Sequence, residues 1–193
     1  MGIEFELKFR ATPEQQAAIR QETPGEETRY VMATTYYDTP SGAMSARKYT
    51  LRQRMENECS VCTLKTPADS YGRREFEVNC PSIQEAIPSL CQLSGIPELP
   101  QILEEGLRPV CGAAFTRIAK TLVLPQCTLE LALDTGILTG GGKELPLCEV
   151  EVELKDGDQD AAIAFATRLS VAYGLTPEKK SKFVRAQALA KGE

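Results

Sequence analysis

The sequence contains no histidine and no tryptophan among its 193 residues. Without histidine, no imidazole can act as a general base or complete a zinc site. Cysteine is present at seven positions, an odd number, and only Cys59 and Cys62 lie close together. These two lie in a β-rich stretch, where an offset of three residues points side chains to opposite faces of a strand. We therefore expect reduced structural thiols rather than disulfides or a metal site.

Long apolar runs and Pro/Gly/Ser-rich linkers are also absent. No segment approaches the roughly 20 apolar residues that cross a bilayer, and the N-terminus lacks a basic region followed by an apolar run. The formal net charge of −5 argues against general binding to nucleic acid or to anionic membranes. These features predict one soluble cytoplasmic domain over residues 1–193, with no nucleic-acid partner and no membrane partner.

Alternation of apolar and polar residues dominates the chain and predicts strands. The predicted strands are 2–10, 30–38, 47–57, 60–66, 72–79, 113–124, 127–134 and 147–155. The predicted helices begin at Thr12-Pro13 and at Ser82, cover 101–107 and 158–173, and begin again at Thr176-Pro177. The three glycines at 140–142 predict a flexible hairpin loop.

Charged side chains collect on one face of these strands. Because residues i, i+2 and i+4 point the same way, Glu4, Glu6 and Lys8 share a face opposite Phe5 and Leu7. The same alternation groups Arg52 with Arg54, Arg73 with Glu75 and Glu77, Glu130 with Asp134, and Glu149 with Glu151 and Glu153. An antiparallel sheet with one face in water would also produce this pattern. Carboxylates in the first and last strands and arginines in the middle ones favour an α+β fold, in which helices pack outside an antiparallel, eight-stranded closed β-barrel with a polar interior.

The charged side chains of such an interior must be neutralised by bound ions or ligands. Carboxylates a few ångströms apart repel one another unless a cation lies between them, and hard divalent cations such as magnesium prefer oxygen ligands. A chain of phosphates would in turn neutralise the basic residues through charge-assisted hydrogen bonds. The basic residues concerned are Arg52, Arg54, Lys65, Arg73, Arg117 and Lys182. Metal-assisted phosphoryl transfer fits both requirements.

Eight ordered motifs, spread over nearly the whole chain, resemble the CYTH superfamily, also called triphosphate tunnel metalloenzymes. They are EFELK (4–8), YYDTP (36–40), LRQR (51–54), TLK (63–65), RRE (73–75), LALDTG (131–136), CEVEVELK (148–155) and SKFVRA (181–186). A single ExExK motif would be weak evidence, since any amphipathic strand can produce it. The branch that the chain resembles most is that of the bacterial inorganic triphosphatases.

This resemblance implies roles for individual residues. The implied metal ligands are Glu4, Glu6, Glu151 and Glu153, with Glu149, Asp134, Glu75 and Glu130 as direct or water-mediated partners of two Mg²⁺ or Mn²⁺ ions. The implied phosphate ligands are Lys8, Arg52, Arg54, Lys65, Arg73, Arg117 and Lys182, with Arg185 assisting and Lys179 extending the basic edge. The implied catalytic residues are Glu4, Glu6, Lys8, Arg52 and Lys65. Alternation favours Arg73 over Arg74 for the interior.

The reaction implied by the resemblance is hydrolysis of inorganic triphosphate to pyrophosphate and orthophosphate. Three alternatives stay open: a class IV adenylyl cyclase, a thiamine triphosphatase, and a polyphosphate- or nucleotide-binding module without turnover. A nucleotide or thiamine ring would require an aromatic platform. The chain has no tryptophan, and Tyr36, Tyr37 and Tyr71 are typical of strand cores or rims. Inorganic triphosphate needs no such platform and is favoured.

Overall fold

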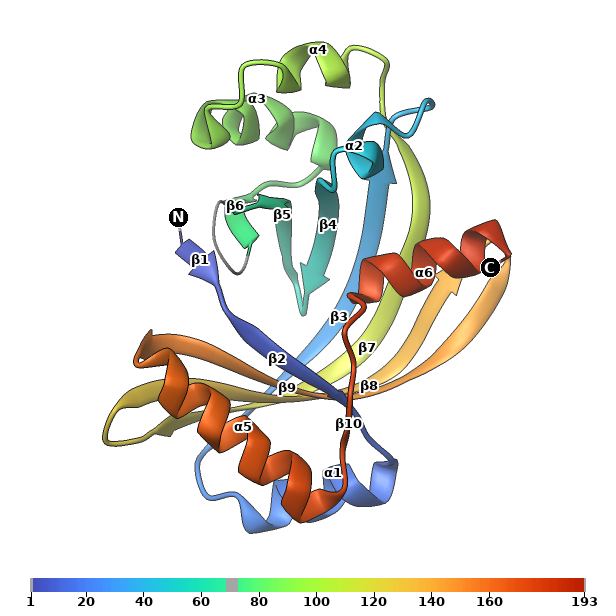
Figure 1. Ribbon diagram of the computed structural model, residues 1–193. Coiled ribbons are helices and arrows are strands. Elements are labelled where there is room, and N and C mark those ends of the chain that lie inside the picture. Colours follow the sequence, from blue (N-terminus) through green and yellow to red (C-terminus); the bar gives the residue numbers. More distant parts are fainter. Residues whose placement is uncertain (1, 69–72, 193) are drawn as a thin grey trace.

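The computed structural model describes residues 2–68 and 73–192 (Figure 1). The strands are β1 (Gly2–Glu4), β2 (Glu6–Arg10), β3 (Glu27–Asp38), β4 (Thr50–Glu56), β5 (Cys59–Pro67), β6 (Arg73–Asn79), β7 (Arg108–Val123), β8 (Cys127–Gly140), β9 (Lys143–Gly157) and β10 (Thr176–Pro177). The helices are α1 (Pro13–Glu22), α2 (Ala43–Ala46), α3 (Ile83–Ser94), α4 (Leu99–Leu103), α5 (Gln159–Tyr173) and α6 (Lys182–Lys191). Tyr71 and Gly72, for which the sequence predicts a core or rim position and a strand start, lie outside the described residues.

All ten strands belong to one antiparallel sheet with the order β1-β6-β5-β4-β3-β7-β8-β9-β2-β10. β1 and β2 follow each other in the chain with Phe5 alone between them, yet β1 pairs with β6 and β2 pairs with β9. The first strand segment of the chain therefore contacts two strands that lie far apart in the sheet order. The predicted eight strands become ten, because the N-terminal strand divides at Phe5 and because β10 forms. Closure of the sheet into a barrel stays a prediction.

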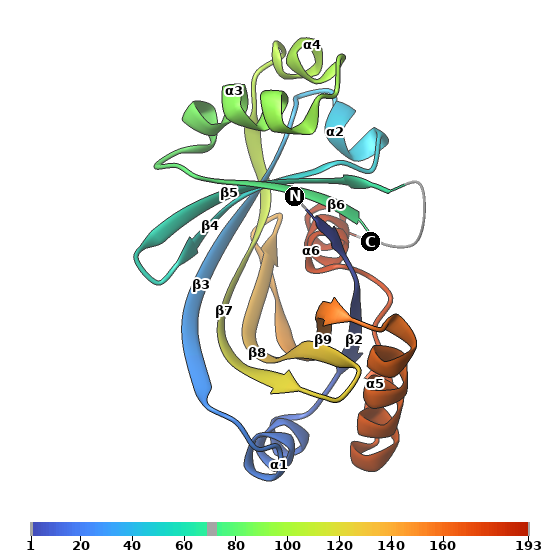
Figure 2. The same cartoon turned by 90° about the vertical axis from the view of Figure 1, so that its left-hand side faces the viewer.

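Two groups of helices cover the apolar face of the sheet at opposite ends of the molecule (Figures 1 and 2). α1 and α5 pack on β2, β8 and β9, where Ile19 and Leu169 join Leu131 and Val150 in one core. α2, α3 and α4 pack on β4, β5 and β6 in a second core. Burial of one such side chain contributes about 1.5–3 kcal/mol, so the apolar alternation fixes the register and leaves the charged residues on the other face. The predicted α+β class is confirmed.

α6 differs from the other helices, because it packs on the face of the sheet that carries the charges. Its Phe183 and Ala186 join a third core with Met32, Phe115 and Leu147. Met32 and Phe115 lie opposite each other in the β3–β7 register. The C-terminal helix is thereby held beside the charged residues of the sheet.

The predicted helix start at Thr176-Pro177 is wrong. These two residues form β10 and pair with Arg10 and Phe9 of β2. The helix begins five residues later, where the Ser181 hydroxyl accepts a hydrogen bond from the backbone N–H of Val184 at 3.2 Å. Threonine before proline imitates a helix cap, but pairing with the edge of β2 stabilises the extended conformation instead.

Two short helices also differ from the prediction. The helix expected at 101–107 is α4, which spans Leu99–Leu103 because Pro100 occupies its first turn and Gly106, with φ of +82°, ends the segment. α2 has no counterpart in the prediction, since four residues give no periodic signal. Among residues 2–68 and 73–192, none of the helices combines the length and the hydrophobicity of a membrane-spanning segment.

The cysteines follow the prediction. All seven are free thiols, and Cys59 is exposed whereas Cys62 is buried, as expected for an offset of three along a strand. The glycine hairpin is also confirmed. Gly140 pairs with Lys143, and the two-residue turn between them, Gly141 and Gly142, has positive φ at both positions.

Candidate active site

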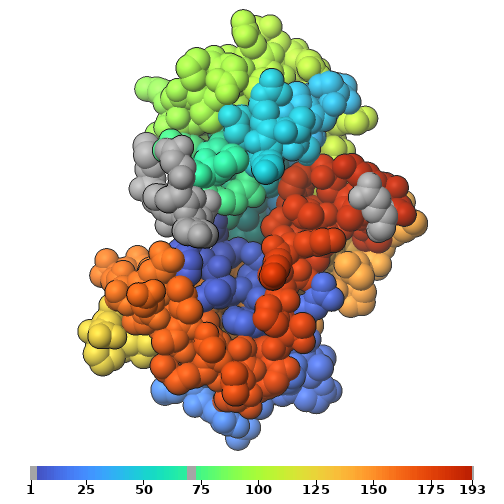
Figure 3. Space-filling view, in the orientation of Figure 1, coloured from blue at the N-terminus to red at the C-terminus, as the bar shows by residue number. Residues whose placement is uncertain are grey.

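The charged face of the sheet borders a cavity of about 660 Å³. Figure 3 shows the surface hollowed between the N-terminal strand in blue and the C-terminal segment in red. Ten basic and eight acidic side chains line this cavity, so the lining suits a polyanion. The predicted site residues in the lining are Glu4, Glu6, Lys8, Arg52, Arg54, Lys65, Arg73, Glu75, Arg117, Glu130, Glu151, Glu153, Lys179 and Lys182. Asp134 and Glu149 are fully buried next to it, and Arg185 contacts Glu149.

Three carboxylates form a row across β2, β9 and β8. The strand register sets Glu6 opposite Glu153, and Glu153 opposite Glu130. Like charges directly opposite each other destabilise a sheet. Burial raises the pKa of Glu6, Glu151 raises it further, and Lys8, whose Nζ lies 2.6 Å from Glu6 Oε1, offsets this only in part. Burial also raises the pKa of Glu153. A divalent cation bound to this carboxylate row would relieve the repulsion.

A second wall of the cavity comes from β4, β5 and β6 and carries four cationic side chains beside the carboxylates of Glu56, Glu75 and Glu77. Its cationic side chains are Arg52, Arg54, Lys65 and Arg73. Lys65 Nζ lies 2.6 Å from Glu4 and 3.1 Å from Glu75, so Lys65 links this wall to the N-terminal strand. Arg73 lines the cavity whereas Arg74 is exposed, which agrees with the alternation of the strand.

Of the arginines in this wall, Arg54 is buried and Arg52 is half-buried. Burial, together with the neighbouring charge of Arg52, lowers the pKa of Arg54 to about 10. Arg54 donates to the Thr34 hydroxyl at 2.9 Å and lies 5.6 Å from the centre of the Phe115 ring. The Nε of Arg52 is buried and has no hydrogen-bond partner among residues 2–68 and 73–192. A buried N–H without an acceptor is unfavourable, and an anionic oxygen in the cavity would satisfy it.

A trio of carboxylates is buried beside the cavity. Asp134, Glu149 and Glu151 offer oxygen atoms within 4.8 Å of one another, close enough to hold one metal ion. In this structure Lys182 Nζ lies 2.8 Å from Asp134, 2.8 Å from Glu149 and 2.6 Å from Glu151. The ammonium group therefore contacts all three members of this buried trio.

Two arginines complete the surroundings of the buried trio. Arg117 donates two hydrogen bonds of 2.8 Å to Asp134 and also contacts Glu151, while Arg185 contacts Glu149. Three carboxylates thus meet three cations. Burial opposes ionisation of Glu151, but Lys182 and Arg117 outweigh it and hold the pKa of Glu151 well below its ordinary value. The carboxylates in turn raise the pKa of Lys182 in spite of its burial.

The donor atoms fit a hard divalent cation. Both acidic groups offer carboxylate oxygens, the ligands that Mg²⁺ and Mn²⁺ prefer. The carboxylate row, with Glu4 nearby, lines the open cavity where phosphate oxygens and water can complete the coordination shell. The buried trio could hold an ion by distance, but an ammonium group lies among its oxygens.

Some cavity residues were not predicted. Lys155 lines the cavity and lies 3.0 Å from Glu153, and the alternation of β9 gives it the same face as Glu153, a signal that the sequence does contain. Lys180 was missed because its segment was expected to be helical. Tyr36 is buried against Phe183, with ring centres 5.1 Å apart, and also lines the cavity. Tyr37 contributes to the core under α2, α3 and α4, as a structural tyrosine is expected to do.

The chain is similar in sequence to known proteins. The sequence profile of the CYTH domain matches residues 2–186. The inorganic triphosphatase of Haemophilus influenzae is 30% identical over 174 residues, which cover 86% of this chain and 49% of that protein. The chain thus spans about half the length of this curated relative.

Solved structures agree in fold. A candidate adenylyl cyclase from Hippeastrum, described as having a dominant triphosphatase activity, superimposes with a TM-score of 0.69 at 20% identity, over 99% of this chain and 97% of that one. A Pyrococcus horikoshii OT3 protein gives 0.64 at 20% identity, over 98% and 99% of the two chains. Because the profile covers residues 2–186, which include every described residue of the cavity lining, the chain belongs to the CYTH domain family.

Proposed function

We propose that this protein hydrolyses inorganic triphosphate to pyrophosphate and orthophosphate in a metal-dependent reaction. The observation that carries the proposal is one cavity with two unlike walls. The carboxylate row offers ligands for divalent cations, and the second wall offers donors for phosphate oxygens. An inorganic triphosphatase among the relatives supports the same reaction.

In the proposed reaction, water adds to a terminal phosphorus and the anhydride P–O bond breaks, so that pyrophosphate leaves. Mg²⁺ or Mn²⁺, held by the carboxylate row of Glu6, Glu153 and Glu130 with Glu4 and Glu75 nearby, would neutralise phosphate oxygens and assist activation of the water. Arg52, Arg54, Lys65 and Arg73 would bind the phosphates, and the buried Nε of Arg52 would gain its acceptor. Lys8, paired with Glu6, lies on the same face and would orient the attacked phosphate.

The sheet would act as the wall of a tunnel around the phosphate chain. We base this proposal on the N-terminal strand, which pairs with β6 before Phe5 and with β9 after it. A closed wall would keep the phosphate chain extended and exclude bulk water from the arginines, which strengthens their electrostatic effect on the reacting group.

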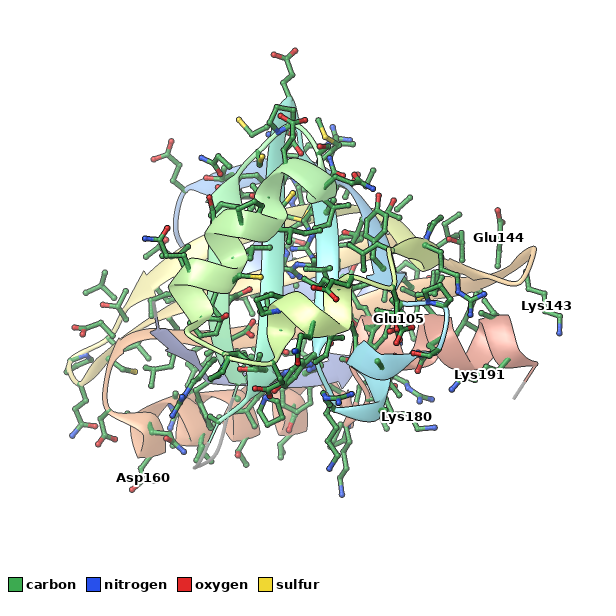
Figure 4. The ribbon with its side chains drawn as sticks, turned by 90° about the horizontal axis from the view of Figure 1, so that it is seen from above. Glu105, Lys143, Glu144, Asp160, Lys180 and Lys191 are labelled. Atoms are coloured by element: carbon green, nitrogen blue, oxygen red, sulfur yellow. The ribbon has the colours of Figure 1, made fainter. Side chains whose placement is uncertain are left out.

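The variant Glu6→Gln tests the proposed metal site. It keeps the size of the side chain and removes one carboxylate charge from the row. We expect turnover of triphosphate to fall at least a hundredfold, roughly the effect of removing one electrostatic group from an active site. Glu144→Gln is the matched control, because Glu144 is exposed near the tip of the β8–β9 hairpin and points away from the molecule (Figure 4). Parent-like turnover by the Glu6 variant would show that this metal-site assignment is wrong.

An organic triphosphate is the second candidate substrate. Tyr30, Tyr36 and Phe183 also line the cavity and could contact an aromatic ring. Phosphate release from ATP and thiamine triphosphate, measured beside inorganic triphosphate, decides between these substrates. Formation of cyclic AMP from ATP would identify the cyclase alternative. Tight binding of all three compounds without release of any product would identify a binding module.

A further inference from the structure

We infer that Lys182, and not a metal ion, is the cation that the buried trio of Asp134, Glu149 and Glu151 holds in this protein. The inference extends the proposed metal dependence by assigning the divalent cations to the carboxylate row alone. It differs from the expectation that Asp134, Glu149 and Glu151 bind metal, and it makes these three residues positioning residues for Lys182.

The middle of the trio has room for one cation. The Lys182 ammonium lies 2.6–2.8 Å from an oxygen of each carboxylate, the distance of a charge-assisted hydrogen bond. A Mg²⁺ ion would need the same oxygens at about 2.0–2.1 Å. The two cations cannot occupy the middle of the trio together.

The charges of the trio are also balanced without a metal ion. The trio carries three negative charges, and Lys182, Arg117 and Arg185 supply three positive ones at contact distance. Asp134 and Glu149 are fully buried. A divalent cation added to this balanced group would leave two uncompensated positive charges in the interior, which is strongly unfavourable. The carboxylate row also has cations nearby, with Lys8 2.6 Å from Glu6, Lys155 3.0 Å from Glu153 and Arg117 3.6 Å from Glu130. It lines the open cavity, however, where water and phosphate oxygens can offset the charge of an added ion.

Neighbouring side chains also fix the position of Lys182. It is the first residue of α6, and only 7% of it is exposed. Its Nζ lies 5.3 Å from the centre of the Phe115 ring, and the next residue, Phe183, is buried in the same core. Packing on both sides therefore holds the ammonium in place, and it does not have the freedom of a surface lysine.

The test is the number of Mn²⁺ ions bound per chain, obtained by subtracting the free Mn²⁺ seen by electron paramagnetic resonance from the total. This measurement does not depend on enzymatic activity. Lys182→Met removes the ammonium and keeps an apolar stem of similar length. We expect this variant to bind one Mn²⁺ more than the parent protein, because the trio becomes available. Its thermal midpoint should be lower than that of the parent in chelator. Mn²⁺ at a concentration about a hundred times its dissociation constant should raise the thermal midpoint of both proteins. The rise in Lys182→Met should exceed the rise in the parent by about 5 °C or more.

Two controls isolate the trio. Lys155→Met removes a cavity lysine beside Glu153 and should leave the number of bound ions unchanged. Adding Asp134→Asn to Lys182→Met should abolish the extra ion. Failure of Lys182→Met to gain an ion would overturn the inference.

A second variant decides the question if Lys182→Met does not fold. Asp134→Asn in the parent background keeps an oxygen acceptor for Arg117 and should bind as many Mn²⁺ ions as the parent. Loss of one ion would mean that the trio binds metal, and the inference would be wrong. If the parent bound no Mn²⁺, the proposed metal dependence would be wrong. The role of Lys182 would still be tested, because Lys182→Met should then bind one Mn²⁺ ion where the parent binds none.

Discussion

Glu178 shows how a single side chain is held by its neighbours at the residue scale. It is 6% exposed, accepts from Arg10 Nε at 2.5 Å and from the backbone N–H of Lys180 at 2.8 Å, and lies 3.8 Å from Arg185. Burial acts against the charged carboxylate, but the backbone donor and the two arginines outweigh it and lower the pKa of Glu178 below its ordinary value of 4.5. The contacts tie the segment before α6 to β2.

This pKa shift predicts how stability depends on pH. A carboxyl with a lowered pKa in the folded state contributes stability above the unfolded value of 4.5, and that contribution is lost as pH falls through the folded value. We expect Glu178→Gln to lower the free energy of unfolding by about 1 kcal/mol at pH 7, a modest value because Arg10 is largely exposed. Urea unfolding at pH 7 and in steps below pH 4.5 should show the difference shrinking with acid. A difference that is constant with pH would contradict this origin.

At the scale of elements, the position of α6 depends on the β8–β9 hairpin. A Cβ atom at Gly140 would lie 2.3 Å from the carbonyl oxygen of Ala186 and 2.8 Å from the backbone nitrogen of Ala190. Only glycine allows α6 to approach this closely. Because α6 begins with Lys182, the hairpin also sets where that ammonium lies.

Gly140→Ala tests this dependence. We expect it to push α6 outward, to destabilise the protein by about 1–3 kcal/mol, and to weaken triphosphate binding, because the cavity lining at 179–184 would shift with the helix. Calorimetric titration with triphosphate and thermal unfolding measure the two effects. Gly142→Asn is the control, since nothing lies within 4 Å of its Cβ position and asparagine tolerates the positive φ of +73°. Equal binding by both variants would show that the hairpin does not position α6.

α1 clamps two strands of the sheet through one buried side chain. Gln16 Nε2 donates to the backbone carbonyls of Asp134 and Glu149, at 3.0 and 2.7 Å, and Gln16 Oε1 accepts from Thr135. Gln16→Leu keeps the volume but leaves both carbonyls without this donor. We expect a loss of about 1–3 kcal/mol in urea unfolding. The exposed Gln21 of the same helix gives the control Gln21→Leu, and a similar loss in that variant would contradict the clamp.

Strands were easier to predict than their ends. Alternation identifies the charged face of β9, because Glu149, Glu151 and Glu153 each have an apolar neighbour in the sequence. It gives no information about which of these carboxylates meets a cation, since Lys182 comes from a helix thirty residues away in the chain. The division at Phe5 and the formation of β10 also depend on pairing with distant strands, which a local pattern does not encode.

At the scale of the whole molecule, the two outer groups of helices and the inner charged face perform separate tasks. The cores under α1 and α5 and under α2, α3 and α4 stabilise the two ends of the sheet. The sheet between them carries charged side chains on eight strands, and these meet Lys182 of α6 at one cavity. Opposite charges compensate one another there, so the protein tolerates these partly buried charges. The buried Nε of Arg52 still has no acceptor among the described residues, and the pKa of Glu6 is raised.

The most direct test of this account is release of orthophosphate from inorganic triphosphate by the purified protein, with Mg²⁺ or Mn²⁺ and with chelator as the blank. We predict fast release that requires the metal and yields one orthophosphate for each pyrophosphate. Absence of release by the folded protein with either metal, or equal release in chelator, would contradict the proposed metal-dependent triphosphatase.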